Sequence, residues 1–285
     1  MALATNPIDI NRGTNGITLP ADIASEILAK TQHESAVMRL ATPITLPGRG
    51  LSIPVVLGDP VAQIVGETAE KPVSNSTFQT KTMTPKKFAV IELFSNEFKR
   101  DLPALYDALV DRLPGSIAKA FDNQVFNGTA LAGFDSLAAA PAVQRGATDT
   151  IADVVTAGMM TVAGNGFRVD GFAASPLYET ELITATDNNG RPLFMNDFAN
   201  DDYVGRVFGQ PVAETDAITT MYGGDWSMAK YGIVDGINIK ISEEATINDG
   251  TQQINLFQRN MFCVLIESEI GFVCADDDAF FRVTV

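Results

Sequence analysis

The stretch LSIPVVLGDPVAQIVGETAEKPVSNSTFQTKTMTPKKFAVIELFSNEF, residues 51–98, decides the fold. Apolar residues recur at every second position over 51–57, and threonine does so over 80–84. Between them, residues 66–72 read GETAEKP, a polar segment. This pattern predicts an extended two-stranded ribbon with a polar tip. Because an isolated hairpin is barely stable in water, we expect the ribbon to lie on another body, most simply a second copy of the chain.

Composition and charge limit the possible functions. The chain has 285 residues, 46% of them hydrophobic, which is enough for one large or two modest domains. Its formal net charge of −15 argues against a surface built to neutralise phosphates. Residues 1–100 hold 10 of the 20 basic and 9 of the 35 acidic side chains, so nearly all the excess negative charge follows the ribbon.

Neither export nor membrane insertion is predicted. The N-terminal residues lack a basic segment followed by an apolar one, which argues against a signal or transit peptide. The longest apolar run, residues 261–266, is far shorter than the ~20 residues that cross a bilayer. Cys263 and Cys274 lie in apolar segments, which favours buried thiols in a reducing cytoplasm over a disulfide framework.

Helical segments are predicted on both sides of the ribbon. Residues 1–16 are rich in Asn, Gly, Thr and Pro and suggest an extended arm, followed by a helix from Pro20 to about residue 30 and a short turn near Ser35. After the ribbon, an apolar residue at every fourth position predicts a long helix over 103–126.

The long helix carries two further expectations. Pro114, followed by Gly115, should bend it, because proline removes one backbone hydrogen bond and clashes with the preceding turn. Asn127 and Gly128 should end it with a left-handed cap.

A compact α/β unit is predicted over residues 131–235. It should contain a helix that begins at Ile151 and ends at the glycines of 164–166, a strand over 171–175, a helix from Pro176 and a turn at 187–190. Residues 236–285 are predicted to be rich in strands. Residues 254–266 are apolar on both faces, which predicts one strand that is covered on both sides.

Common catalytic and metal-binding patterns are missing from the sequence. His33 is the only histidine, which excludes multi-histidine metal sites, and we expect it to be a solvated surface residue. The glycines at 164–166 lack the spacing of a dinucleotide-binding loop. The three aspartates at 276–278 could bind a hard cation, but solvation is the simpler reading. Lysines 81, 86 and 87 are read as edge-strand lysines that deter aggregation, not as a nucleic-acid surface. We predict no cofactor and no metal.

The ribbon resembles the extended-loop region of major capsid proteins of tailed bacteriophages, the Hong Kong 97-like fold family. The resemblance rests on the VGE and KP residues of the tip, the S-x-x-T-F step, the TPKK strand and the SNE exit into the helix. Further blocks follow in the family's order: FNG at 126–128, NGRPL at 189–193, FGQPV at 208–212 and GDW at 224–226. The resemblance covers nearly the whole chain.

The resemblance implies an α+β fold with four regions. Residues 1–43 would form an N-terminal arm with a short helix, and 44–98 the extended loop. Residues 99–130 and 236–285 would form a β-rich peripheral domain with a long spine helix, and 131–235 an α/β axial domain.

The resemblance also implies a structural protein and its partners. Subunits would form pentamers and hexamers of an icosahedral shell around double-stranded DNA, which the acidic chain would contact weakly and without specificity. The protein would be part of the virion capsid, assembled in the cytoplasm of the host bacterium. Portal and decoration proteins are possible partners. Many relatives carry a scaffolding segment before the arm, whereas this chain starts at Met1 with the arm, so a separate scaffolding protein is expected.

A covalent link between subunits is implied by the same resemblance. The founding member joins its subunits through a Lys–Asn isopeptide bond that a Glu assists, and the matching positions here are Lys71, Asn260 and Glu267. A neutral lysine amine would attack the carboxamide while the carboxylate takes up a proton. Deprotonating an ordinary lysine at pH 7 costs about 4.6 kcal/mol, so assembly would have to desolvate the site. Seven residues of strand place Asn260 and Glu267 ~23 Å apart and on opposite faces, so three subunits would have to meet.

Two other functions remain open from the sequence. An encapsulin-like shell that holds an enzyme cargo would share the fold. An unrelated α/β hydrolase is a third possibility, although the single histidine and the absence of a nucleophile motif argue against it.

Overall fold

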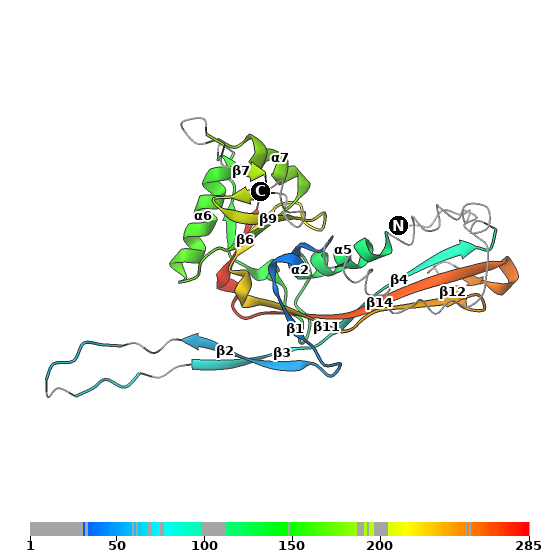
Figure 1. Ribbon diagram of the computed structural model, residues 1–285, viewed down its shortest axis with the longest axis horizontal. Helices are drawn as coiled ribbons and strands as arrows, with labels where there is room; N and C mark the ends of the chain where they lie inside the picture. The colour runs from blue at the N-terminus through cyan, green and yellow to red at the C-terminus, as the bar shows by residue number, and fades with distance from the viewer. Residues whose placement is uncertain are drawn as a thin grey trace.

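The computed structural model describes residues 31, 34–58, 60, 62–67, 70–74, 77–97, 112–147, 149–186, 191–192, 194–196, 205–248, 250 and 252–284. Expectations for residues 1–30, His33, residues 98–111 and the turn at 187–190 lie outside the described residues. Figure 1 shows two bodies, one built on an elongated sheet and one on a smaller sheet with helices, and a hairpin that extends beyond both.

The elongated body is a four-stranded sheet with the strand order β1-β11-β14-β4. Its strands are β1 (Thr42–Thr45), β4 (Lys86–Ser95), β11 (Ala229–Ser242) and β14 (Met261–Cys274). Strands β11 and β14 pair antiparallel on both sides of a bulge between Ile233 and Ile237. At this bulge Gly236 has a φ of +71°, a left-handed conformation that glycine adopts without steric cost. Beside this sheet, β12 (Thr246–Asn248) and β13 (Gln253–Asn255) form a two-stranded sheet.

Helix α5 (Leu113–Phe126) covers one face of the four-stranded sheet. Its side chains Ile117 and Phe121 are buried in one cluster with Phe262, Val264 and Ile266 of β14. Because side chains alternate along a strand, the odd-numbered positions of β14 lie on the opposite face. That opposite face carries charged residues and is the basis of the candidate site below.

The second body is a seven-stranded sheet with the order β5-β15-β10-β6-β9-β8-β7. Its strands are β5 (Ala142–Gln144), β6 (Gly171–Ala174), β7 (Phe194–Asn196), β8 (Gly205–Val207), β9 (Gln210–Glu214), β10 (Met221–Gly224) and β15 (Phe280–Thr284). Helices α6 (Ile151–Gly164) and α7 (Pro176–Thr184) share a hydrophobic cluster with one face. The short helix α2 (Ala36–Leu40) and α5 share a cluster with the other face.

Several predictions for this second body are confirmed. The helix expected from Ile151 ends at Gly164, and the next helix begins at Pro176. A capping box starts α6, because the Thr150 hydroxyl accepts from the Asp153 N–H while the Asp153 carboxylate accepts from the Thr150 N–H. Strand β15 joins this sheet, although its residues lie within the segment 236–285 that the resemblance groups with the spine helix.

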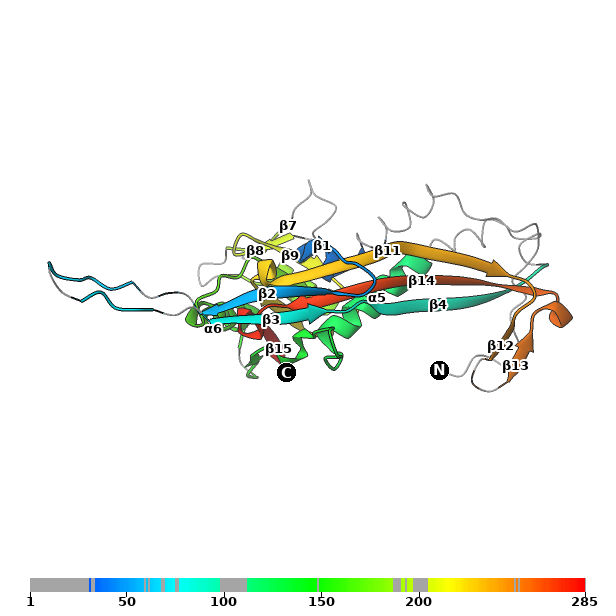
Figure 2. The ribbon, with the colours of Figure 1, turned by 90° about the horizontal axis from the view of Figure 1, so that it is seen from below.

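The predicted ribbon is confirmed as a hairpin. Strands β2 (Leu51–Gly58) and β3 (Thr77–Met83) pair antiparallel and form a sheet of their own. Figure 2 shows the hairpin running past the end of the seven-stranded body. Residues 86–95, the last part of the ribbon stretch, instead form β4 of the four-stranded sheet.

Of the two further expectations for the long helix, the left-handed cap is wrong, whereas a bend at Pro114 would involve residues 103–111, which lie outside the described residues. Pro114 lies in the first turn of α5, where its missing N–H would have no partner within the helix, so it does not bend the described helix. Asn127 has φ −113° and ψ −13°, and Gly128 is not among the described residues with positive φ. The helix therefore ends without a left-handed cap, although at the expected residue.

The single strand predicted over 254–266 is also wrong. The segment contains β13, then the 3-10 helix η3 (Phe257–Arg259), and then the start of β14. Asn260 makes the break, because its φ of 52° and ψ of 48° are left-handed and asparagine tolerates this conformation better than most residues. Three further 3-10 helices are described: η1 (Leu137–Ala139), η2 (Trp226–Met228) and η4 (Asp277–Ala279).

A buried carboxylate joins the two bodies. Asp122 of α5 is fully buried. It accepts hydrogen bonds from the Ser35 hydroxyl (2.5 Å), the Ala36 N–H (2.9 Å), the Val37 N–H (3.4 Å) and the Thr215 hydroxyl (2.9 Å). These donors belong to the N-terminus of α2 and to the turn after β9. One side chain therefore links three segments that are far apart in the sequence.

Candidate functional site

The three residues predicted for the crosslink lie in three separate places. Lys71 is exposed in the loop between β2 and β3, Asn260 directly precedes β14, and Glu267 lies in the middle of β14. The hairpin loop and the start of β14 lie at opposite ends of the molecule (Figure 1). A single copy of the chain therefore does not bring Lys71 to Asn260.

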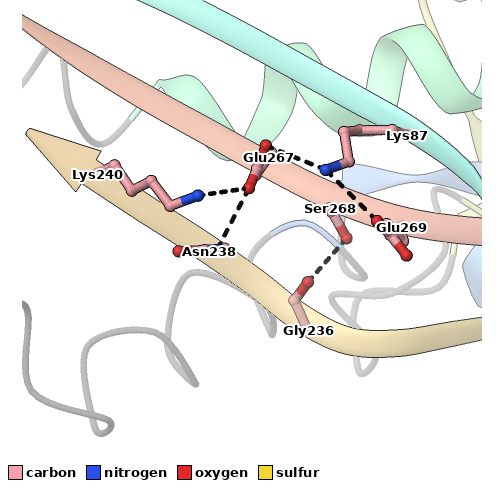
Figure 3. A network of polar contacts seen from close by, with 7 residues as sticks. All are labelled: Lys87, Gly236, Asn238, Lys240, Glu267, Ser268 and Glu269. Atoms are coloured by element: carbon pink, nitrogen blue, oxygen red, sulfur yellow. Dashed lines mark hydrogen bonds and ion pairs between the residues drawn. The ribbon is translucent and has the colours of Figure 1, made fainter. Parts of the chain in front are cut away.

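Glu267 lies in a network of charged residues across three strands (Figure 3). Its Oε1 accepts from Lys240 Nζ of β11 at 3.1 Å and from Asn238 Nδ2 at 3.3 Å. Its Oε2 is 3.4 Å from Lys87 Nζ of β4, which is also 3.4 Å from Glu269 Oε1. The carboxylate is thus held by a lysine on each side within its own subunit.

This network favours the ionised form of Glu267. The hydrogen bond and charge of Lys240, with a contribution from Lys87, lower the pKa of the Glu267 carboxyl below its usual value. The charge of Glu267 in turn raises the pKa of the Lys87 ammonium group. A carboxylate with a lowered pKa is a poor proton acceptor, so in the isolated subunit Glu267 is better suited to linking strands than to acting as a base.

Asn260 presents its carboxamide at the surface. Its backbone carbonyl accepts from the Asn96 N–H at 2.8 Å, and its Oδ1 lies 3.4 Å from Asn96 Nδ2. These contacts and the left-handed backbone hold Asn260 at the turn into β14. Neighbouring Phe257 of η3 leaves 79% of its surface exposed. The end of the four-stranded sheet therefore combines an accessible amide with an exposed aromatic ring.

The outer part of the hairpin exposes apolar side chains. Ile64 and Val73 are almost fully exposed, and Phe78 of β3 leaves 69% of its surface accessible. Singly exposed apolar residues are common, whereas several on one projecting hairpin are typical of a surface that contacts another molecule. Sequence reasoning found the hairpin from its alternation but not the apolar character of these particular positions.

The root of the hairpin is fixed to the body. Ile53 and Met83 are buried against Leu46 and Val273. Lys81 Nζ donates to the Cys274 carbonyl at 2.5 Å and pairs with Asp135 at 3.2 Å. Since Lys81 and Lys87 both form ion pairs within the subunit, they do more than deter edge-to-edge aggregation, which was their predicted role.

Other predicted features have ordinary structural roles. Cys263 and Cys274 are buried free thiols, as expected. The Asp276 side chain accepts from the Asp278 N–H and caps η4. Among the described residues, no group of three or more His, Cys, Asp or Glu could hold a metal ion. No helix within these residues is long and apolar enough to cross a membrane.

Comparison with known proteins gives consistent matches over most of the chain. Residues 15–285 match the model of the family described as "Phage capsid family". The chain is 28% identical over 284 residues to the probable major capsid protein gp17 of Mycobacterium phage D29, covering 93% of this chain and 89% of that protein. It is 26% identical over 215 residues to the major capsid protein of Enterobacteria phage HK97, covering 74% of this chain and 54% of that protein. A solved chain from Mycobacterium phage Adephagia aligns with a TM-score of 0.69 at 20% identity, over 88% of this chain and 89% of that chain.

Proposed function

The chain belongs to the phage capsid family, and from this membership we propose that it is the major capsid subunit of a tailed bacteriophage, which assembles with copies of itself into the capsid shell. The expected family and the α+β fold are confirmed. The structural observation that carries the proposal is the projecting hairpin, because its exposed apolar residues need a surface that the subunit itself does not supply.

The finer description of the shell is part of the same proposal. Copies would form pentamers and hexamers of an icosahedral shell around double-stranded DNA, and the shell would be assembled in the bacterial cytoplasm. The division into arm (1–43), extended loop (44–98), peripheral domain (99–130 and 236–285) and axial domain (131–235) also stays a proposal. Portal, scaffolding and decoration proteins would be further partners.

Electron microscopy of purified particles tests the assignment. We expect closed shells in which this chain is the most abundant protein by mass spectrometry, with DNA inside that survives external nuclease. The relatives are named major capsid proteins, so an encapsulin-like compartment is not favoured. Shells filled with an enzyme instead of DNA would nevertheless identify such a compartment. A chain that is absent from the shell would contradict the proposal.

The covalent crosslink is a further proposal that the resemblance supports. The neutral Lys71 Nζ of one copy would attack the Asn260 side-chain carbon of a second. Glu267 of a third copy would take a proton from the attacking nitrogen and pass it to the departing amide nitrogen, which leaves as ammonia. In the isolated subunit, Lys240 and Lys87 hold the Glu267 carboxylate in its ionised form. Assembly must therefore separate Glu267 from these lysines before it can act as the base.

Boiling mature particles in SDS tests the crosslink. We expect a ladder of covalent oligomers from the wild type and a single band from a Lys71→Arg variant, which keeps the charge but is a far poorer nucleophile. A single band at the subunit mass from wild-type particles would reject the crosslink and leave the shell assignment unaffected.

A further inference from the structure

The turn between β8 and β9 has an unusual backbone. Val207 pairs with Gln210, so only Phe208 and Gly209 form the loop. Both residues have positive φ, 49° for Phe208 and 82° for Gly209. Two-residue hairpin loops of this kind favour Asn-Gly or Asp-Gly, because a large side chain is disfavoured in the left-handed region. Phe208 therefore keeps a local strain that an asparagine would relieve.

Burial within the subunit offsets the strain at Phe208 only in part. The residue leaves 42% of its surface exposed at the tip of the turn. Strained residues that persist in a fold are enriched at functional sites, and exposed aromatic rings are frequent anchors of protein interfaces. An aromatic ring held in this position is therefore explained best by a contact outside the subunit.

A matching surface lies on helix α6 of the same body. The exposed positions Thr156, Ala157, Met160 and Ala163 carry no charge. Met160 leaves 70% of its surface accessible. A helix on a water-exposed surface normally presents charged side chains there, so an outer face that carries no charge beyond Asp153 of the first turn indicates that it is covered in the assembly. The small neighbours of Met160 leave room for a ring, and methionine sulfur packs favourably against aromatic rings.

The two surfaces lie on different parts of the seven-stranded sheet. Helix α6 packs against β5, β15 and β10 at one end of the strand order, whereas the Phe208 turn joins β8 and β9 near the other end. Figure 1 shows α6 on one flank of this body. When two different patches of one subunit meet between copies, the contact is head-to-tail and can repeat around a ring.

We propose that Phe208 of one subunit packs on the outer face of α6, at Met160, of the next subunit in the ring. Charge complementarity supports the pairing. Arg206, which also donates to the Gly209 carbonyl, is exposed beside the turn, and Asp153, whose carboxylate also accepts from Thr150, is exposed in the first turn of α6. The inference rests on the proposed shell function and names one contact that holds neighbouring subunits together.

A Phe208→Asn variant tests the strain and the contact together. It should raise the melting temperature of the unassembled subunit by about 2–4 °C, since it introduces the favoured Asn-Gly turn. It should also raise the protein concentration needed for assembly by about tenfold or more, since the ring is lost. Phe208→Tyr keeps the ring and should assemble like the wild type. An Asn variant that assembles normally would overturn the proposal.

A cysteine pair locates the partner surface. A chain with both Phe208→Cys and Met160→Cys should form disulfide-linked oligomers in assembled particles under mild oxidation, whereas each single variant should not. The native Cys263 and Cys274 are buried and do not interfere. Intact particles without such oligomers would overturn this contact alone. A wild-type chain that forms no particles would overturn the proposed function and this contact with it.

Discussion

Deletion of residues 67–76 is expected to leave a folded subunit that no longer forms stable shells. The deletion removes the polar tip and Val73 but keeps the paired strands β2 and β3. It also keeps the buried contacts of Ile53 and Met83 and the ion pair between Lys81 and Asp135. The two hydrophobic cores outside the hairpin are unchanged. The melting temperature of the deletion variant should therefore differ from that of the wild type by only a few degrees.

Assembly should respond far more strongly to this deletion than folding does. The projecting hairpin has too little apolar surface of its own to be stable alone, and its exposed side chains gain burial only against another molecule. Particle yield, measured by sedimentation and electron microscopy, should fall at least tenfold. A Gln63→Ala variant changes an exposed residue of the same loop outside the deletion and should assemble normally. Shells of ordinary yield and heat stability from the deletion variant would contradict this role.

Features that depend on local sequence signals could be predicted. Helix α6 begins after the N-cap Thr150 and ends at Gly164, and both signals lie within a short stretch of sequence. The hairpin is readable for the same reason, because strand alternation needs only neighbouring residues. The break at Asn260 could not be read, because one left-handed residue interrupts an apolar run without changing its composition.

Features that depend on strand register could not be predicted. The Glu267 network requires Asn238 to lie opposite Glu267 and Ala89 to lie on its other side. A shift of one residue would place each side chain on the other face, and the bulge at Gly236 makes such a shift impossible to infer from the sequence. The resemblance located Glu267, but only the structure shows the lysines that hold it. The turn at Phe208 likewise lacks the asparagine that signals this type of hairpin.

The link at Asp122 should make stability depend on pH in an unusual direction. Burial raises the pKa of this carboxyl from 3.8 to about 6, although four hydrogen bonds oppose the shift. The folded state therefore binds a proton more tightly than the unfolded state does. The stabilisation from Asp122 is fully present below about pH 4 and is lost as the pH rises through about 6. The shift corresponds to about 3 kcal/mol between these limits.

Comparison with Asp122→Asn isolates this contribution, because the amide does not titrate. The difference in unfolding free energy, wild type minus variant, should become less favourable to the wild type by about 3 kcal/mol between pH 3 and pH 7. Urea unfolding of the unassembled subunit at several pH values measures it. Parallel pH curves for the two proteins would show that Asp122 has an ordinary pKa and would reject the explanation by burial.

Removing the carboxylate altogether should still destabilise the subunit at pH 7. Asp122→Ala leaves the N–H groups of Ala36 and Val37 and the hydroxyls of Ser35 and Thr215 without their acceptor. Unsatisfied buried donors cost about 1–3 kcal/mol each, which exceeds the gain from no longer burying a charge. We expect a net loss of about 2–4 kcal/mol, together with faster hydrogen exchange at Ala36 and Val37. If hydrogen exchange accelerated only at residues far from α2, the loss of stability would not come from the Asp122 link. The two bodies would then be joined by other contacts.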